Sequence, residues 1–250
     1  MHRLLTLFTA IFLVQVSTFS YGQSPAAPKA ATGNGASTAV TITASTPPED
    51  LAKAALTAQG GEKFRNLHNM MLRGSVDLYA PNSTQSIPGG FVIVTAGDKV
   101  RIEIDARPAV SFKQIFDGQQ SYSSIPGVEL PPASKFGLNV LGKFDQPGYK
   151  VTAIPDKKKL RGFRISDSEG NATEFYLEAT TGRVVSFYIG YNGYTFATEN
   201  KKFKEFEGVL VPTNFIQRLE MPQGAFFAEY NVKDVKLNQQ LGEDVFAIPN

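Results

Sequence analysis

The sequence predicts a mostly β (α+β) protein, built as a strongly curved antiparallel sheet of about eleven strands with an N-terminal helix and a helical lid loop. Three observations predict this class. The hydrophobic period changes from helical to alternating near Met70 and then stays alternating almost to the C-terminus. Short turn signals, such as Asp117-Gly118 and Asn192-Gly193, separate consecutive strands. A meander of so many strands is expected to curl instead of staying flat.

Residues 1–22 have the pattern of a cleavable export signal. Arg3 supplies a positive charge, residues 4–16 are almost entirely apolar, and Ser20 and Gly22 place small residues before a cleavage point. The apolar run is shorter than the roughly 20 residues that a membrane-spanning helix needs. We therefore expect cleavage after Gly22 and a periplasmic or secreted product that does not span the membrane.

The amino-acid composition argues against several kinds of covalent link and binding partner. The chain has no cysteine, so we expect neither disulfides nor a lipid attached to an N-terminal cysteine. It has 25 basic and 23 acidic residues, and this near balance lacks the basic face of a nucleic-acid-binding protein. The same balance argues against general electrostatic attachment to an anionic membrane.

A tether is predicted between the signal and the folded part. Residues 23–46 are rich in Ala, Ser, Thr, Pro and Gly, carry one charge and have no apolar period, which is typical of disorder. A single domain is then expected over residues 47–250.

The domain is predicted to begin with a helix from Pro48 to about Gln59. Thr46 and Glu49 have the spacing of a capping box, proline is favourable at a helix start, and Gly60-Gly61 should end the helix. A second short helical turn is expected at residues 62–66.

The clearest strand is predicted at residues 99–107. Val100, Ile102 and Ile104 alternate there with charged residues, so one face should be buried and the other solvated. Similar patterns predict strands at residues 70–79, 91–95, 111–116, 120–124, 149–154, 160–166, 173–178, 183–191, 194–206, 209–221 and 225–237.

One segment interrupts the strands. Residues 126–147 carry six large apolar side chains between prolines and glycines, and we expect a loop with a short helix near residues 134–141. Exposed, these side chains would form a patch that soluble monomers seldom tolerate. The loop is therefore predicted to cover the concave side of the sheet, with Phe136 and Leu138 as a plug.

Four short segments, in this order, resemble the outer-membrane lipoprotein carrier superfamily of lipoprotein-sorting proteins (LolA/LolB-like). They are Ala54-Ala55-Leu56-Thr57-Ala58-Gln59-Gly60-Gly61-Glu62-Lys63-Phe64 leading into Met71-Leu72-Arg73-Gly74-Ser75-Val76; Lys99-Val100-Arg101 followed by Gln114-Ile115-Phe116-Asp117-Gly118-Gln119-Gln120-Ser121-Tyr122; Phe206-Glu207-Gly208-Val209-Leu210-Val211-Pro212; and residues 238–249, ending Asp244-Val245-Phe246-Ala247-Ile248-Pro249. The resemblance covers residues 48–250.

The resemblance implies an open half-barrel closed by a helical lid, with an apolar cavity for a lipid or an acylated protein. No cofactor is expected. Where the bacterial carriers place an arginine-proline pair, whose arginine helps to hold and release cargo, this chain reads Thr95-Ala96-Gly97 and departs from the family pattern. The alternative is an envelope sensor or interaction module that uses the same fold to bind an envelope protein.

Apolar residues on the alternating strands and the lid are the candidates for the cavity wall. They are Phe91, Ile102, Ile104, Phe112, Phe116, Phe136, Leu138, Phe175, Leu177, Phe187 and Ile189. Arg73 or Arg101 is expected near the head group of the ligand. A plain packed core would need the same alternation, so the sequence leaves both interpretations open.

No catalytic residue or metal ligand is expected. After signal removal His68 is the only imidazole, too few for a zinc site, and no nucleophile elbow or phosphate-binding loop occurs. A hydrolase, the third interpretation, would have to use His68. Residues 167–171 with Glu178 imitate a calcium loop, but Ala172 stands where that loop needs glycine, so a hairpin turn is expected.

Overall fold

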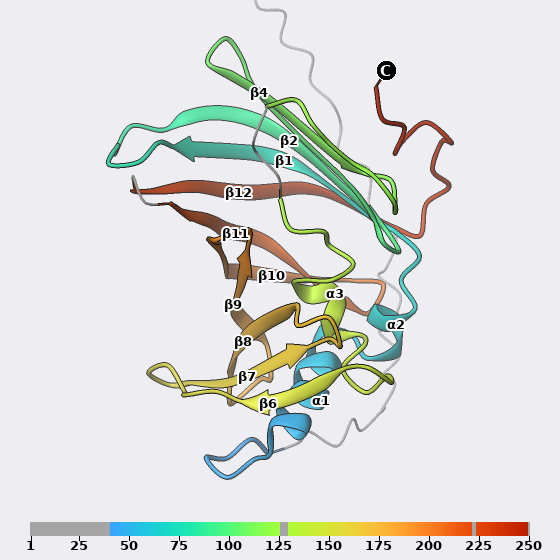
Figure 1. Cartoon of the computed structure of the whole chain (residues 1–250), viewed down its shortest axis with the longest axis vertical. Coiled ribbons are helices and arrows are strands. Elements are labelled where there is room, and N and C mark those ends of the chain that lie inside the picture. Colours follow the sequence, from blue (N-terminus) through green and yellow to red (C-terminus); the bar gives the residue numbers. More distant parts are fainter. Residues whose placement is uncertain (1–40, 126–129, 222–223, 250) are drawn as a thin grey trace, which may run out of the picture. The chain divides into compact units, whose positions relative to one another are not determined.

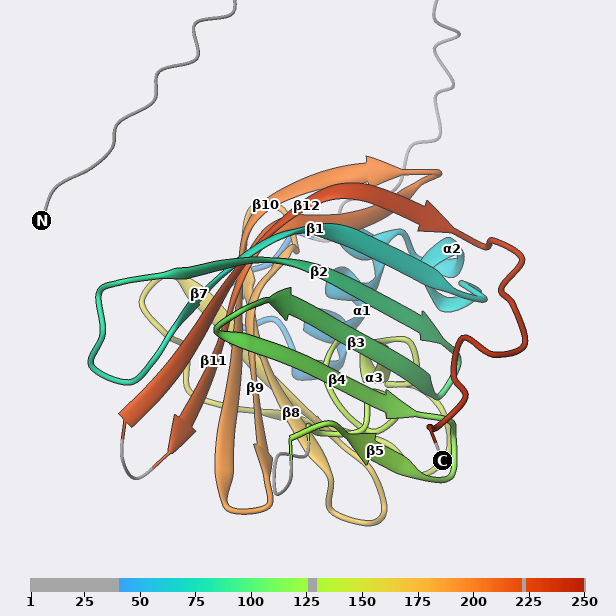
Figure 2. The ribbon, with the colours of Figure 1, turned by 90° about the horizontal axis from the view of Figure 1, so that it is seen from above.

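The computed structural model describes residues 41–125, 130–221 and 224–249. Within these ranges twelve strands form one antiparallel sheet, and three short helices lie on its concave side (Figures 1 and 2). The sheet has two free edges and is not closed into a barrel, which confirms the predicted curved, open half-barrel. The predicted signal and residues 23–40 of the predicted tether lie outside the described residues.

The elements follow the predicted order. The helices are α1 (Pro48–Gln59), α2 (Glu62–Arg65) and α3 (Leu138–Leu141). The strands are β1 (Met70–Tyr79), β2 (Ile87–Ala96), β3 (Lys99–Ala106), β4 (Val110–Phe116), β5 (Ser121–Ser123), β6 (Lys150–Ala153), β7 (Leu160–Ser166), β8 (Ala172–Glu178), β9 (Val184–Tyr191), β10 (Tyr194–Phe206), β11 (Val209–Met221) and β12 (Gly224–Leu237).

Helix α1 has the predicted bounds but a different start. Pro47 is its N-cap, without a side-chain cap, and the hydroxyl of Thr46 accepts a hydrogen bond from the Thr43 N–H instead. The predicted capping box therefore does not form. At the other end Gly60 has a φ of 123° and its N–H closes the last turn, as the glycine pair predicts.

Helix α3 is shorter than predicted, because it begins only at Leu138. Gly137, directly before it, has a φ of 70°, a left-handed conformation that interrupts a helix. The segment ahead of it, from Leu130, is therefore an irregular strap across the sheet. We call residues 130–141 the lid.

The middle of the sheet is formed by the first and the last strand, β1 and β12. Consecutive strands are antiparallel neighbours with one exception, since β5 and β6 form the two opposite edges of the sheet. In addition, β1 pairs with β12 as well as with β2. Strands β1–β5 thus form one half of the sheet, β6–β11 the other, and β12 joins them. Asn192 and Gly193 both have positive φ between the paired Tyr191 and Tyr194, which confirms the predicted two-residue turn.

Two glycines permit close backbone approach in the sheet. A Cβ on Gly74 would lie 1.9 Å from the carbonyl oxygen of Asn231, at the bulge where β1 shifts register against β12. A Cβ on Gly89 would lie 2.7 Å from the carbonyl oxygen of Asp105. Strand β2 consequently begins at Ile87, earlier than predicted, because Gly89 and Gly90 continue its pairing.

The concave face holds two apolar clusters that share no buried residue, and the half-buried Phe64 packs against both. One packs α1 and α3 against β6–β9, with Phe163 stacked on Phe175 at 5.1 Å between ring centroids. The other lies on β1–β3, β11 and β12, with Tyr230 between the rings of Phe91 and Phe215. Ile42, from the predicted tether, packs against the first cluster, so ordered packing begins before residue 47.

A third, smaller cluster covers the convex face of β1–β4. Phe246 and its neighbours in the C-terminal tail pack there against Val94 and Ile115. Arg101 fixes the tail, since its Nη1 donates a 2.8 Å hydrogen bond to the carbonyl oxygen of Val245. The tail therefore shields the outer surface of the sheet and leaves the inner surface free.

Candidate functional site: an apolar pocket under a lid

A cavity of about 550 Å³ lies on the concave face between the two clusters. This volume is within the usual range of roughly 300–1,000 Å³ for ligand pockets. Both halves of the sheet and the lid contribute to its wall, which is mostly apolar. The lining residues are Met70, Leu78, Tyr79, Ala80, Ile87, Ile93, Thr95, Val100, Ile102, Val110, Gln114, Leu130, Pro131, Ala133, Phe136, Gly137, Leu138, Asn139, Phe187, Ile189, Phe196, Ala197, Thr198, Gln217, Arg218, Leu219, Phe226, Phe227 and Ala228.

The lid is fixed to the first half of the sheet by Gln114 of β4. The Leu130 N–H donates to Gln114 Oε1 at 3.1 Å, and Gln114 Nε2 donates to the Leu130 carbonyl at 3.4 Å. Gln114 is buried, and these two bonds satisfy both ends of its amide. This residue therefore sets where the lid starts to cross the pocket.

The lid is fixed to the second half of the sheet by Thr173 of β8. The Gly137 N–H donates to the fully buried Thr173 hydroxyl at 3.0 Å. Beside it the ring of Phe136 meets Tyr191 of β9 edge-on, with centroids 5.7 Å apart, and Phe136 is only 4% exposed. The lid thus bridges both halves of the sheet over the pocket.

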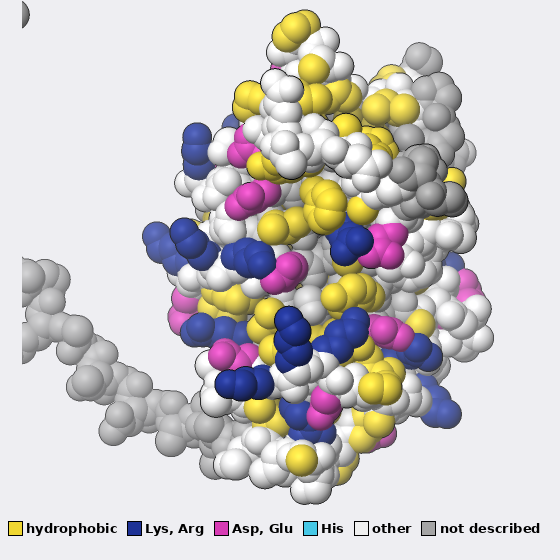
Figure 3. All heavy atoms as spheres, turned by 90° about the vertical axis from the view of Figure 1, so that its left-hand side faces the viewer, with side chains coloured by type: hydrophobic (Ala, Val, Ile, Leu, Met, Phe, Trp, Pro, Cys, Tyr) yellow, Lys and Arg dark blue, Asp and Glu magenta, His cyan; other side chains and the backbone are white. Residues whose placement is uncertain are grey.

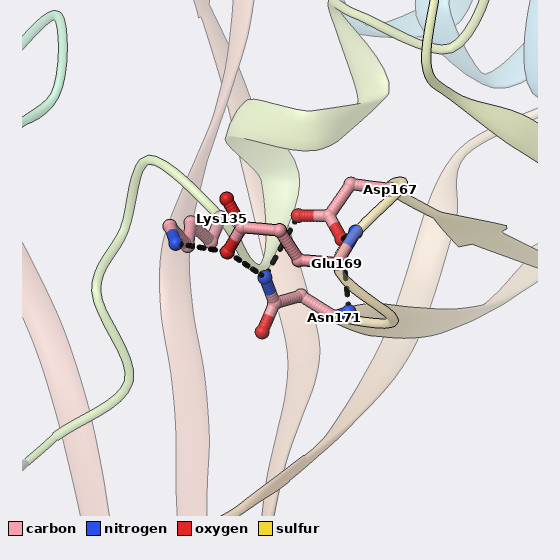
Figure 4. A network of polar contacts seen from close by, with 4 residues as sticks. All are labelled: Lys135, Asp167, Glu169 and Asn171. Atoms are coloured by element: carbon pink, nitrogen blue, oxygen red, sulfur yellow. Dashed lines mark hydrogen bonds and ion pairs between the residues drawn. The ribbon is translucent and has the colours of Figure 1, made fainter.

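An exposed polar network adds a further tie between the lid and the β7–β8 turn (Figure 4). Lys135 Nζ lies 2.5 Å from Glu169 Oε2, and this hydrogen bond raises the pKa of Lys135. Asp167 accepts from the backbone N–H groups of Glu169 and Asn171 and from the Asn171 side chain. Burial raises the pKa of Asp167, but these hydrogen bonds outweigh burial and leave it below its ordinary value.

This turn is the segment whose sequence imitates a calcium loop. Because Asp167 accepts N–H groups of its own turn, its carboxylate serves the hairpin, as expected. Among the described residues, no three His, Asp or Glu side chains lie together in a group that could hold a metal.

Five of the apolar residues expected at the cavity do line it. They are Ile102 of β3, Phe136 and Leu138 of the lid, and Phe187 and Ile189 of β9. They come from three separate parts of the chain, so the fold brings them together at one surface.

The other expected residues lie on the same face but in its packed parts or at its edge. Phe91 and Ile104 belong to the cluster around Tyr230, and Phe112 packs against that cluster. Phe175 and Leu177 are fully buried in the α1 cluster, and Phe116 is half-buried at the β4–β5 edge, outside the pocket wall.

Neither arginine that we expected near a head group borders the pocket. Arg101 alternates with the pocket residue Ile102, so it points to the convex face, where it binds the C-terminal tail and Glu103. Arg73 is exposed, and its neighbour in β2 is Val92, which packs on the convex face. The arginine that the pocket wall does include is Arg218 of β11.

Sequence reasoning missed most of the pocket mouth. Phe226 and Phe227 of β12 line the pocket and are 42% and 38% exposed, so they mark where it opens to solvent. Gln114, which orients the lid, was also missed. One available signal was the pair of consecutive phenylalanines, because strict alternation buries only one of two neighbours.

His68 lies on the exposed link between α2 and β1, away from the pocket wall. Its Nδ1 is 3.0 Å from the carbonyl oxygen of Asn66, and its backbone N–H donates to Asn238 Oδ1. Within the described ranges, no helix is both long and apolar enough to cross a membrane.

The open, curved antiparallel sheet of this chain has the LolA-like fold. A LolA superfamily protein from Nitrosomonas europaea superposes with a TM-score of 0.53 at 12% identity, covering 81% of this chain and 98% of the other. A DUF1329 family protein from Desulfovibrio piger gives a TM-score of 0.50 at 8% identity, covering 80% and 97%. At such identities the likeness concerns the fold alone. No protein-family model and no curated protein matches the sequence.

Proposed function

We propose that this chain is an exported, non-catalytic protein that binds a lipid, or the acyl chain of a lipid-linked molecule, in the pocket under the lid. The single observation that carries the proposal is a mostly apolar cavity of about 550 Å³ left open between two well-packed clusters. An ordinary core would have filled this space, since protein interiors pack to crystal-like density.

The chemistry of the wall supports an apolar ligand. Gln114 and Thr198 are the buried polar side chains among the wall residues, and the lid backbone already satisfies both ends of the Gln114 amide. The wall therefore favours apolar contact over recognition by charge, and each buried CH₂ of a ligand is worth roughly 0.8 kcal/mol. Arg218, half-exposed and paired with Glu220, is the cationic side chain of the wall.

The test has two arms. A native mass spectrum of protein purified from its own cell envelope should show a bound species that organic solvent extracts. Fluorescent palmitate should bind in vitro, and Ile102→Phe should weaken its uptake at least about tenfold by filling the cavity, a change of about 1.4 kcal/mol. Ala133→Leu fills the cavity from the lid and should act in the same direction without altering any strand.

The matched control places the same ring on the other face of the neighbouring strand. Ser111→Phe, at an exposed position of β4, should leave uptake unchanged. Circular dichroism of all variants checks that the sheet is folded. Equal uptake by the Ile102, Ala133 and Ser111 variants would contradict binding in this cavity. An empty protein recovered with a tightly bound envelope protein would instead favour the alternative role as an interaction module.

A further inference from the structure

The large apolar side chains that are exposed gather at one place. Among the described residues they are Tyr194 at 40%, Phe226 at 42% and Phe227 at 38% exposure, which we call the tip aromatics. Tyr194 begins β10 at the β9–β10 turn, and both phenylalanines follow the β11–β12 turn. The two hairpins are adjacent, because Thr195 pairs with Glu220. Two of the three tip aromatics also form the pocket mouth.

A third hairpin lies beside these two. A Cβ on Gly224 would be 3.0 Å from Pro81, so the β1–β2 loop touches the start of β12. In Figure 2 the β1–β2 loop, the start of β12 and the β9–β10 turn follow one another along the left and lower margin. Together they border the open side of the pocket.

The ends of these three hairpins contain no charged residue. Residues 78–97, 184–198 and 221–228 have no Asp, Glu, Lys, Arg or His. The neighbouring turns on the same edge of the sheet carry charge, since Arg107 follows β3 and Glu169 follows β7. Three lysines, 157–159, lie at the opposite end of β7. In Figure 3 yellow side chains are frequent in the upper half of the molecule, and lysine and arginine concentrate in the middle and lower half.

We propose that the tip aromatics and the uncharged hairpin ends around them dock on a lipid bilayer, with the aromatic rings in the interfacial layer and the pocket mouth facing the membrane. Aromatic side chains favour this layer, and a charge taken to the bilayer centre costs about 2.5–3.5 kcal/mol. An uncharged end can enter the layer without that penalty. A lipid chain could then pass between bilayer and pocket without crossing water, and this last step alone rests on the proposed function.

The charges nearest the tips predict which lipids are needed. Arg218 is paired with Glu220 at 3.1 Å and lies over the ring of Phe227. The next acidic residues, Asp77 and Glu229, face each other across β1 and β12. This balance offers no excess positive charge to an anionic surface. Docking should therefore occur on zwitterionic phosphatidylcholine vesicles and should be insensitive to salt.

The absence of tryptophan allows a direct measurement. Tyr194→Trp creates a single reporter at a tip residue that does not line the pocket. Its emission should shift to the blue on addition of phosphatidylcholine vesicles and should be quenched by brominated acyl chains. Phe203→Trp, near the opposite end of β10, is the matched control and should not respond. Tyr194→Ser should lower vesicle partitioning about tenfold, a loss of about 1.4 kcal/mol.

The outcomes separate docking from ligand binding. Tyr194→Ser should leave the uptake of palmitate from solution unchanged. If the pocket has no ligand affinity, palmitate uptake fails; if the tip aromatics have no membrane affinity, only vesicle binding fails. An unchanged Tyr194→Trp spectrum with vesicles would overturn the proposal. A response confined to anionic vesicles and abolished by about 1 M salt would also overturn it, because it would indicate electrostatic binding. Equal responses of the Tyr194 and Phe203 reporters would overturn it as well.

Discussion

The side chain of Asp167 stabilises the β7–β8 turn, to which the lid is tied through Glu169. Its carboxylate accepts three N–H hydrogen bonds inside the β7–β8 turn, and Glu169 of the same turn pairs with Lys135 of the lid. These bonds favour the charged form in the folded protein, so the folded pKa is lower than that of the unfolded chain. As the pH falls, the unfolded chain therefore takes up this proton first.

We predict that Asp167 contributes its full stabilisation above its ordinary pKa of 3.8 and loses it as the pH falls through its lower folded value. A carboxyl titration followed by NMR should give a midpoint below 3.8. Asn171→Ala removes one of the donors and should raise that midpoint. An Asp167 midpoint at or above the ordinary value would show that the turn does not form as described.

At the scale of elements, the hydrogen bond from the Gly137 N–H to the buried Thr173 hydroxyl is one of the ties that hold the lid. We predict that Thr173→Val, which keeps the shape but removes the hydroxyl, leaves a buried N–H unpaired and lowers the stability of the closed lid by about 1–3 kcal/mol. Hydrogen exchange at the Gly137 amide should accelerate, and bound palmitate should dissociate faster. The sheet should remain folded, because Gly137 lies outside every strand.

Thr173→Ser is the matched control for the lid, because it restores the hydroxyl and should keep exchange at Gly137 slow. If serine and valine accelerate exchange equally, the methyl group of Thr173 holds the lid and the hydroxyl does not.

How much the sequence predicts differs from element to element. Helix α1 and the strands follow from periodicity, because the 3.6- and 2-residue repeats persist over many residues. Helix α3 was predicted too long, since a four-residue helix is set by Gly137 and by contacts with β8. Alternation identified one face of the sheet but did not separate core from pocket. Phe175 and Phe187 have the same pattern, yet Phe175 lies under α1 and Phe187 reaches the cavity.

At the scale of the whole molecule, the pocket lies between two clusters that do not share a buried residue. A bound chain would touch both halves of the sheet and the lid at once, so it should stabilise the folded protein as a unit. At a palmitate concentration about one hundred times the Kd, the free energy of unfolding should rise by about 2.7 kcal/mol. For a domain of this size the Tm should then rise by about 5 °C or more.

Differential scanning calorimetry with and without palmitate measures this shift. The pocket-filled Ile102→Phe variant is the control, and its Tm should respond much less. A full shift in that variant would place the stabilising ligand elsewhere on the molecule.

The pairing of β1 with β12 has a consequence for the order of events during synthesis and folding. The central ladder of the sheet joins Met70 to Leu237, so the two halves of the sheet cannot be joined before nearly the whole chain is available. Contacts so distant in sequence form slowly, because a long loop must close first. The complete sheet can therefore form only after the last strand has been made, although the cluster of α1 with β6–β9 contains no residue of that strand.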